Sequence, residues 1–171
     1  MKYLFINLNL QLGLILMKKI SAYVDTSVFG GIFDEEFKRA SNTFFHQVKM
    51  DYFDVYISPL VRNEISLAPL HVQNFFQEIF PYLKSVEVTD EALNLRDSYL
   101  ASKIVSKKYT NDALHVALAT VSGCLFIISW NFKHIVNYEK IALYNAINLS
   151  EGYRQISIYS PLEVVSHEKE F

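Results

Sequence analysis

Short apolar runs alternate along this chain with stretches of helical spacing, and this alternation constrains the fold more than any other feature. The strand-like runs are residues 20–24, 54–58, 85–88, 125–129 and 156–159. The helical patterns between them are residues 37–50, 59–65, 72–80, 89–105, 110–122 and 135–142. Strands separated by helices predict a parallel sheet covered on both faces. We therefore predict an α/β fold, a three-layer α/β/α sandwich with a central, mostly parallel five-stranded sheet.

Polar residues and a glycine indicate where several of these helices begin and end. Ser58 stands before Pro59, the residue pair expected at an N-cap and first helical position. Thr89 is followed by acidic residues, which are typical of a first turn. Gly123 follows the most apolar helical stretch and is suited to end it.

The length of 171 residues suits one compact domain, which we assign to residues 17–171. Residues 1–16 (MKYLFINLNLQLGLIL) are apolar but too short to span a membrane. They lack a small-x-small cleavage site, so a signal peptide is disfavoured. We interpret them as an N-terminal extension that arises from a translation start placed too early, with Met17 as the true start. A peripheral strand or helix is the alternative.

Charge and cysteine content narrow the functional classes. The net charge is −2, from 18 acidic and 16 basic residues, so any nucleic-acid binding must use a local basic patch. Cys124 is the single cysteine, which excludes an internal disulfide and favours a reducing cytoplasm. Its apolar neighbours predict a buried, inert thiol. No membrane partner is expected. The 13 Phe and 11 Tyr favour a large core and self-association.

Acidic residues follow the predicted strands at one end of the sheet. Asp25 ends the first strand, and a carboxylate at the edge of a core needs a cation or a set of donors. Glu64 lies in the helix after the second strand, Asp112 opens the most apolar helix, and Asn131 follows the fourth strand. Ligands bind beyond the carboxyl ends of parallel strands. Clustered carboxylates there suit Mg²⁺ or Mn²⁺. Taken singly, Asp112 also fits a capping acid and Glu64 an exposed helix acid.

Four motifs follow one another along the chain: VDTS at 24–27, Glu64, NDALHVALA at 111–119 and SWNFKH at 129–134. In this order they resemble the PIN-domain family, the nuclease fold that includes the VapC-type toxins. The resemblance covers about residues 20–165.

The resemblance implies a metal-dependent ribonuclease that hydrolyses RNA phosphodiester bonds. Asp25, Glu64, Asp112 and Asn131 would hold Mg²⁺ or Mn²⁺, and the Ser27 hydroxyl would donate to a carboxylate or phosphate. It also implies the toxin of a toxin–antitoxin pair, with an antitoxin partner and a homodimer. Many family members carry an aspartate where this chain has Asn131. That residue adds no charge, so metal affinity should be lower.

Two other functions are weighed against this one. A phosphatase of the haloacid-dehalogenase type also starts from an aspartate after the first strand, but it needs a second aspartate where this chain has Ser27. A catalytically weak PIN fold that binds RNA or protein remains the alternative.

Several residues near the motifs allow a structural and a functional interpretation. His115 is interpreted as a core histidine and Trp130 as a packing residue. The run 107–109 and the pair 133–134 either flank an RNA path or are solvated surface.

Overall fold

The computed structural model describes residues 19–165. The predicted extension at residues 1–16 lies outside them. The strands are β1 (Ile20–Val24), β2 (Phe53–Ile57), β3 (Leu83–Ser85), β4 (Phe126–Ile128) and β5 (Ser157–Tyr159). The helices are α2 (Thr26–Gly31), α3 (Lys38–Lys49), α4 (Pro59–Ser66), α5 (Leu70–Ile79), α6 (Asp90–Ala101), α7 (Thr110–Val121), α8 (Tyr138–Ser150) and α9 (Pro161–Val164). The short 3₁₀ turns η1 (Phe80–Tyr82) and η2 (Lys107–Tyr109) precede β3 and α7.

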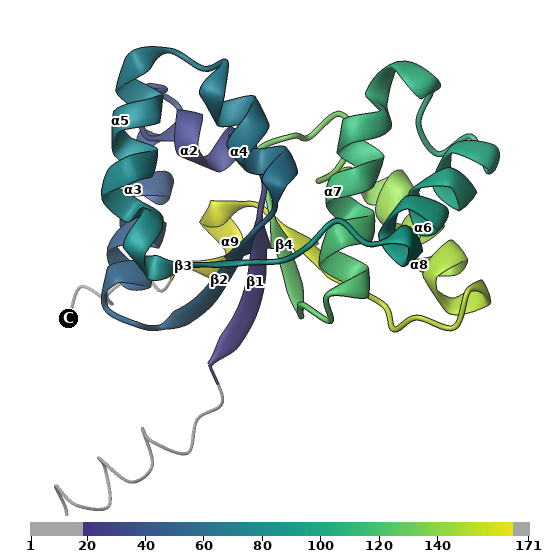
Figure 1. The fold of residues 1–171 in the computed structure, drawn as a ribbon. Coiled ribbons are helices and arrows are strands. Elements are labelled where there is room, and N and C mark those ends of the chain that lie inside the picture. Colours follow the sequence, from purple (N-terminus) through teal and green to yellow (C-terminus); the bar gives the residue numbers. More distant parts are fainter. Residues whose placement is uncertain (1–18, 166–171) are drawn as a thin grey trace, which may run out of the picture.

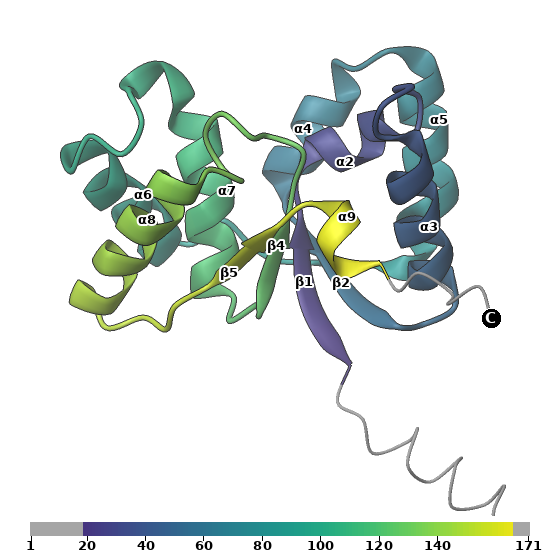
Figure 2. The same cartoon turned by 180° about the vertical axis from the view of Figure 1, so that it is seen from behind.

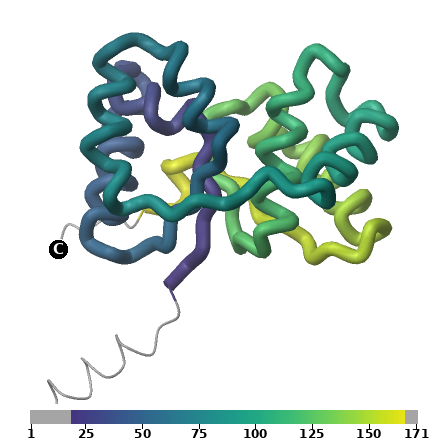
Figure 3. The backbone as a smooth tube through the Cα atoms, viewed as in Figure 1, coloured from purple at the N-terminus to yellow at the C-terminus, as the bar shows by residue number. Residues whose placement is uncertain are grey.

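The described strands form one sheet of five in the order β3-β2-β1-β4-β5. Each neighbouring pair is parallel, so the predicted α/β sandwich is confirmed. β1 lies in the centre, where Ala22, Tyr23 and Val24 are fully buried. The order reverses at β1, because the chain moves outward to β2 and β3 and then returns to β4 on the other side (Figure 3). Such a reversal is where ligands bind in open α/β sheets.

Two layers of helices cover the sheet. Helices α2 to α5 pack on one side and α6 to α8 on the other (Figures 1 and 2). Helix α7 is buried over eight consecutive residues, from Ala113 to Thr120. This is the reason that its sequence has almost no polar face. The core cluster runs through the sheet into both layers.

The predicted helix ends are mostly confirmed. Ser58 caps α4 by accepting a hydrogen bond from the Val61 backbone N–H, and Thr89 caps α6 in the same way from Ala92. Gly123 follows α7 with φ +68°, and Cys124 N–H donates to the Ala119 carbonyl. This is the bond pattern of a helix that ends on a left-handed residue.

Several elements differ from prediction. Helix α8 covers Tyr138–Ser150 rather than 135–142, and the short helix α2 was not predicted. Helix α6 was expected to reach residue 105, but it ends at Ala101, because Lys103 adopts φ +58° and turns the chain. Lysine is not a usual residue at that position, so the stop is hard to see in the sequence. Strand β3 covers 83–85 rather than 85–88. Its Lys84 and Ser85 are exposed, so the strand lacks an apolar alternation.

Two further expectations concern the core and the membrane. Cys124 is free and buried, and burial raises the pKa of its thiol to about 12, as expected for an inert side chain. Within residues 19–165, no helix combines the length and apolarity needed to cross a bilayer.

Candidate active site

The predicted site residues come from four elements at the same end of the sheet. Asp25 directly follows β1 and caps α2, and Glu64 lies on α4, which follows β2. Asp112 is in the first turn of α7, and Asn131 lies three residues after β4. In Figure 1 the chain enters α2 and α4 at the upper ends of β1 and β2.

Asp25 is buried and fully engaged by protein donors. Its side chain is 4% exposed. Oδ1 accepts from the Ser27 hydroxyl (2.6 Å) and the Ser27 backbone N–H (3.2 Å), and Oδ2 accepts from the Ser129 hydroxyl (3.0 Å). Burial raises the pKa of Asp25, although nearby His115 and these hydrogen bonds oppose the effect. Ser27 therefore donates to a carboxylate, one of the two roles expected for it.

Ser27 and Ser129 also tie this carboxylate to the loop after β4. The Trp130 backbone N–H donates to Ser27 Oγ (2.8 Å), and the Asn131 backbone N–H donates to Ser129 Oγ (2.9 Å). The indole of Trp130 is buried, stacks on Phe37 with ring centroids 4.3 Å apart, and donates to Ser41 Oγ (2.9 Å). Trp130 is therefore a packing residue, as predicted, and it anchors the loop that carries Asn131.

Three donors hold Glu64 in place. Thr26 Oγ1 donates a short hydrogen bond to Oε2, Asn111 Nδ2 donates to Oε1 (3.0 Å), and His115 Nε2 lies 3.1 Å from Oε2. Burial alone would raise the pKa of Glu64, but these hydrogen bonds outweigh it and the net shift is downward. Glu64 is therefore stabilised as a carboxylate.

His115 connects Glu64 to the core through a chain of buried hydrogen bonds. His115 Nδ1 lies 2.9 Å from Tyr23 Oη, which lies 2.8 Å from Ser58 Oγ. An ionised Glu64 only accepts, so His115 Nε2 carries a proton. In a neutral imidazole Nδ1 then accepts from Tyr23, and Ser58 donates to Tyr23. His115 is a satisfied core histidine, as predicted, and it orients Glu64.

Asn131 meets Asp112 through its nitrogen. Its Nδ2 donates to Asp112 Oδ1 (3.0 Å), and its Oδ1 accepts from the His134 backbone N–H (3.0 Å). The backbone donor fixes the orientation of the amide, because only oxygen can accept from it. Burial raises the pKa of Asp112, and the charges of Asp25 and Glu64 add to this, against His115 and Lys140.

The donor chemistry of this edge fits a hard divalent cation, although the present conformation does not enclose one. In the described part of the chain, no three His, Cys, Asp or Glu side chains are grouped closely enough to hold a metal ion. Each predicted ligand is bonded to a protein donor instead. Asp25, Glu64 and Asp112 nevertheless lie near enough to oppose one another's ionisation. A cation among them would relieve this repulsion.

Sequence reasoning missed several residues that position the acids, namely Tyr23, Thr26, Asn111 and His115. Thr26 and Asn111 are each adjacent to a predicted acid, and this adjacency was a usable signal. The contact between Tyr23 and His115 spans 92 residues, and no local pattern points to it.

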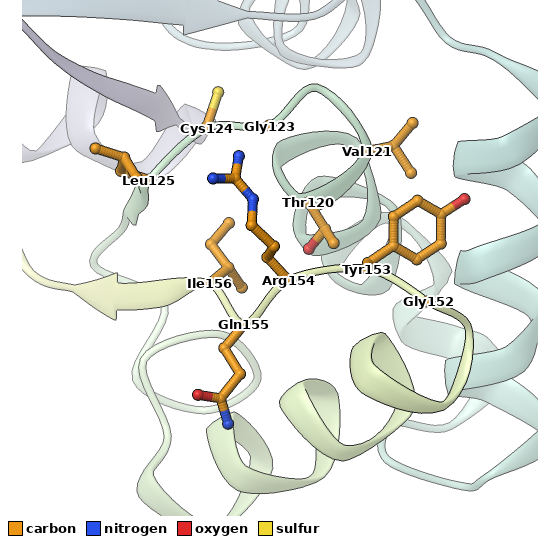
Figure 4. A pocket seen from close by; sticks show the side chains of 10 residues that line it. All are labelled: Thr120, Val121, Gly123, Cys124, Leu125, Gly152, Tyr153, Arg154, Gln155 and Ile156. Atoms are coloured by element: carbon orange, nitrogen blue, oxygen red, sulfur yellow. The ribbon is translucent and has the colours of Figure 1, made fainter.

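A hollow of about 460 Å³ lies elsewhere (Figure 4). Its lining includes Leu125 and Ile156, which immediately precede β4 and β5, so it adjoins the amino ends of these strands. Figure 4 shows the Arg154 guanidinium beside Gly123 and Cys124. None of the predicted site residues lines this hollow, which is therefore separate from the acidic edge.

Comparisons with known proteins identify the fold. The sequence matches no family model and no curated protein. Its structure is similar to that of VapBC2 from Rickettsia felis, bound to a DNA fragment from its promoter, with a TM-score of 0.53, 12% identity, and coverage of 82% of this chain and 98% of that one. It is also similar to FitAcB from Neisseria gonorrhoeae, with a TM-score of 0.54, 13% identity, and coverage of 84% and 99%. The chain therefore has the PIN-type fold to which its sequence motifs pointed.

Proposed function

We propose that this chain is a Mg²⁺- or Mn²⁺-dependent ribonuclease that hydrolyses phosphodiester bonds in RNA. Asp25, Glu64, Asp112 and Asn131 are the proposed ligands of the ion. The observation that supports the proposal is the placement of three carboxylates at the switch point of a parallel sheet with the PIN-type fold: Asp25 after β1, Glu64 on α4 and Asp112 at the start of α7.

The proposed ion and the residues around it have different roles. A bound divalent ion would lower the pKa of the attacking water and would neutralise charge on the scissile phosphate. Ser27 and Ser129 hold the Asp25 carboxylate by hydrogen bonds. His115 holds Glu64 in its ionised, acceptor-only form. Asn131 would contribute its amide oxygen, which accepts from the His134 backbone N–H and keeps a second lone pair.

The proposal is tested by incubating labelled RNA with the protein in Mn²⁺ and in EDTA. Wild type is expected to cleave in Mn²⁺ alone, and Asp25→Asn is expected to abolish cleavage while circular dichroism stays unchanged. Asp97→Asn is the matched control, because Asp97 is an exposed acid on α6 that contacts Arg96. Metal-independent cleavage, or equal loss in both variants, would refute the proposal.

A second candidate is a catalytically weak PIN fold that binds RNA or protein. It is favoured by Asn131, which adds no charge to the site and whose amide nitrogen donates to Asp112 Oδ1. This candidate predicts RNA binding that is insensitive to Asp25→Asn and no cleavage in Mn²⁺.

We further propose that the chain is the toxin of a toxin–antitoxin pair in the cytoplasm, with an antitoxin partner and a homodimeric state. The similarity to VapBC2 and FitAcB supports this assignment. Exposed apolar side chains such as Leu67 (89% exposed) and Leu70 (70%) are suited to an interface. Light scattering of the purified protein is expected to give the mass of a dimer.

A further inference from the structure

Three lysines gather beside the acidic edge around one tyrosine and one histidine. We define the lysine cluster as Lys108, Lys133 and Lys140 with Tyr109 and His134. Lys133 Nζ lies 5.4 Å from the centroid of the Tyr109 ring and Lys108 Nζ 5.7 Å from it. Lys140 Nζ lies 2.9 Å from His134 Nδ1. The rings of Tyr109 and His134 pack with centroids 3.8 Å apart.

The positive charge of this cluster is largely uncompensated. The ion pairs formed by carboxylates of residues 19–165 use Lys19, Lys38, Lys49, Lys84, Arg96 and His115, and none uses a lysine of the cluster. The charge of Lys140 acts on Asp112, where it lowers the pKa of the carboxyl group. Three ammonium groups around the packed rings of Tyr109 and His134 make the surface positive there, so a bound anion would be stabilised.

His134 adds a donor that lacks an acceptor. An ammonium only donates, so His134 Nδ1 accepts from Lys140 and the proton of the neutral ring lies on Nε2. In the described part of the chain, His134 Nε2 is the buried side-chain polar atom without a hydrogen-bond partner. His134 is 6% exposed. A buried N–H without an acceptor is costly and calls for an explanation. His134 therefore adds an N–H without an acceptor to a cluster that already carries three ammonium groups.

The cluster is joined to the proposed site. Asn131, which donates to Asp112, accepts from the backbone of His134. Tyr109 immediately precedes α7 and lies three residues before Asp112. The cluster therefore adjoins the acids through Asn131, and an RNA strand bound at the acids would pass beside it.

We propose that the lysine cluster is a phosphate-binding subsite for single-stranded RNA, which holds a backbone phosphate next to the cleaved bond. This inference rests on the proposed function for its substrate class. The lysines supply charge and ammonium donors, and the Tyr109 ring contacts both Lys108 and Lys133.

The test is RNA binding without metal, measured by fluorescence anisotropy with a fluorescein-labelled single-stranded oligonucleotide in EDTA. Lys108→Gln with Lys133→Gln is the test variant, because both side chains are exposed and the fold should survive. Lys38→Gln with Lys49→Gln on α3 is the control with the same change in net charge. Each phosphate contact contributes about 0.7 to the slope of log K against log salt, which is about fivefold in affinity at 0.1 M salt.

The test variant is therefore expected to bind about fivefold more weakly and to lower the slope by about 0.7, because the subsite holds one phosphate, while the control stays near wild type. Inorganic phosphate is expected to compete with the RNA. Equal losses in both variants, or an unchanged slope, would overturn the subsite. Competition by polyglutamate as strong as by RNA would do the same, because it would indicate a surface for acidic proteins.

Cleavage in Mn²⁺ is scored separately on the same proteins. If the lysine variant loses binding but no protein cleaves, the subsite stands and the nuclease proposal fails. If wild type cleaves and the lysine variant binds RNA normally, the nuclease stands and the subsite fails.

Discussion

Two adjacent glycines in α2 should respond to alanine in opposite directions. A Cβ on Gly31 would lie 2.6 Å from Trp130 Nε1, 2.7 Å from Ser41 Oγ and 2.8 Å from Trp130 Cδ1. A Cβ on Gly30 would meet nothing within 4 Å. Neither glycine has a positive φ, so steric contact alone separates the two positions.

The size of the effect follows from the atoms that must move. The methyl group at Gly31 would press on two buried side chains that hydrogen-bond to each other. Overpacking of this kind costs about 1–3 kcal/mol, and the strained hydrogen bond adds about 1 kcal/mol. The higher helix propensity of alanine offsets about 1 kcal/mol, so Gly31→Ala should lower the free energy of unfolding by about 1–3 kcal/mol. Gly30→Ala gains the helix propensity of alanine without a steric clash, so it should raise the free energy of unfolding by about 0.5–1 kcal/mol.

Urea unfolding of both variants, followed by circular dichroism, measures the difference at constant m-value. We expect the midpoints to fall on opposite sides of wild type. Because Trp130 anchors the loop to Ser27, Gly31→Ala should also reduce RNA cleavage. Equal midpoints for the two variants would refute the packing of Trp130 against Gly31.

Three further predictions concern the acidic edge. The pKa of Asp112 is raised, so its ionisation opposes folding, and stability falls as pH rises from the unfolded value through the folded one. Asp112→Asn should therefore be more stable than wild type at pH 7 and lose that advantage near pH 3 in thermal melts, and a variant less stable at pH 7 would contradict this. Tyr23→Phe leaves His115 Nδ1 without its donor and should cost about 1–3 kcal/mol in urea unfolding, whereas a neutral effect would show that the chain of hydrogen bonds contributes nothing. Asn131→Asp should destabilise the metal-free protein, because it places a second carboxylate beside Asp112. The same change should tighten Mn²⁺ binding in calorimetry. Weaker binding would exclude this side chain from the coordination sphere.

The sequence allows the position of the acids to be predicted because that position depends on local order. Asp25 follows a strand, Glu64 follows the next strand and its capped helix, and the parallel topology brings their ends together. The direction in which each side chain points depends on long-range contacts. The bond from Asn131 to Asp112 and the chain through Tyr23 are therefore invisible in the sequence.

The lysine cluster illustrates the same division. Residues 107–109 and 133–134 are recognisable as basic segments near the motifs. Lys140 is not recognisable in this way. It lies in the first turn of α8, and the chain folds back before that helix so that its ammonium donates to the Lys133 carbonyl (2.9 Å). The contacts of Lys140 with Lys133 and His134 depend on the tertiary fold, so the spacing of charges along the sequence does not predict them.

The most direct test of the metal site is Mn²⁺ binding by isothermal titration calorimetry, on wild type and Asp25→Asn side by side. We predict saturable binding in wild type and its loss in Asp25→Asn, with unchanged circular dichroism in both. Binding in neither protein, or equal binding in both, would contradict the assignment of Asp25 and its neighbouring acids as a metal site.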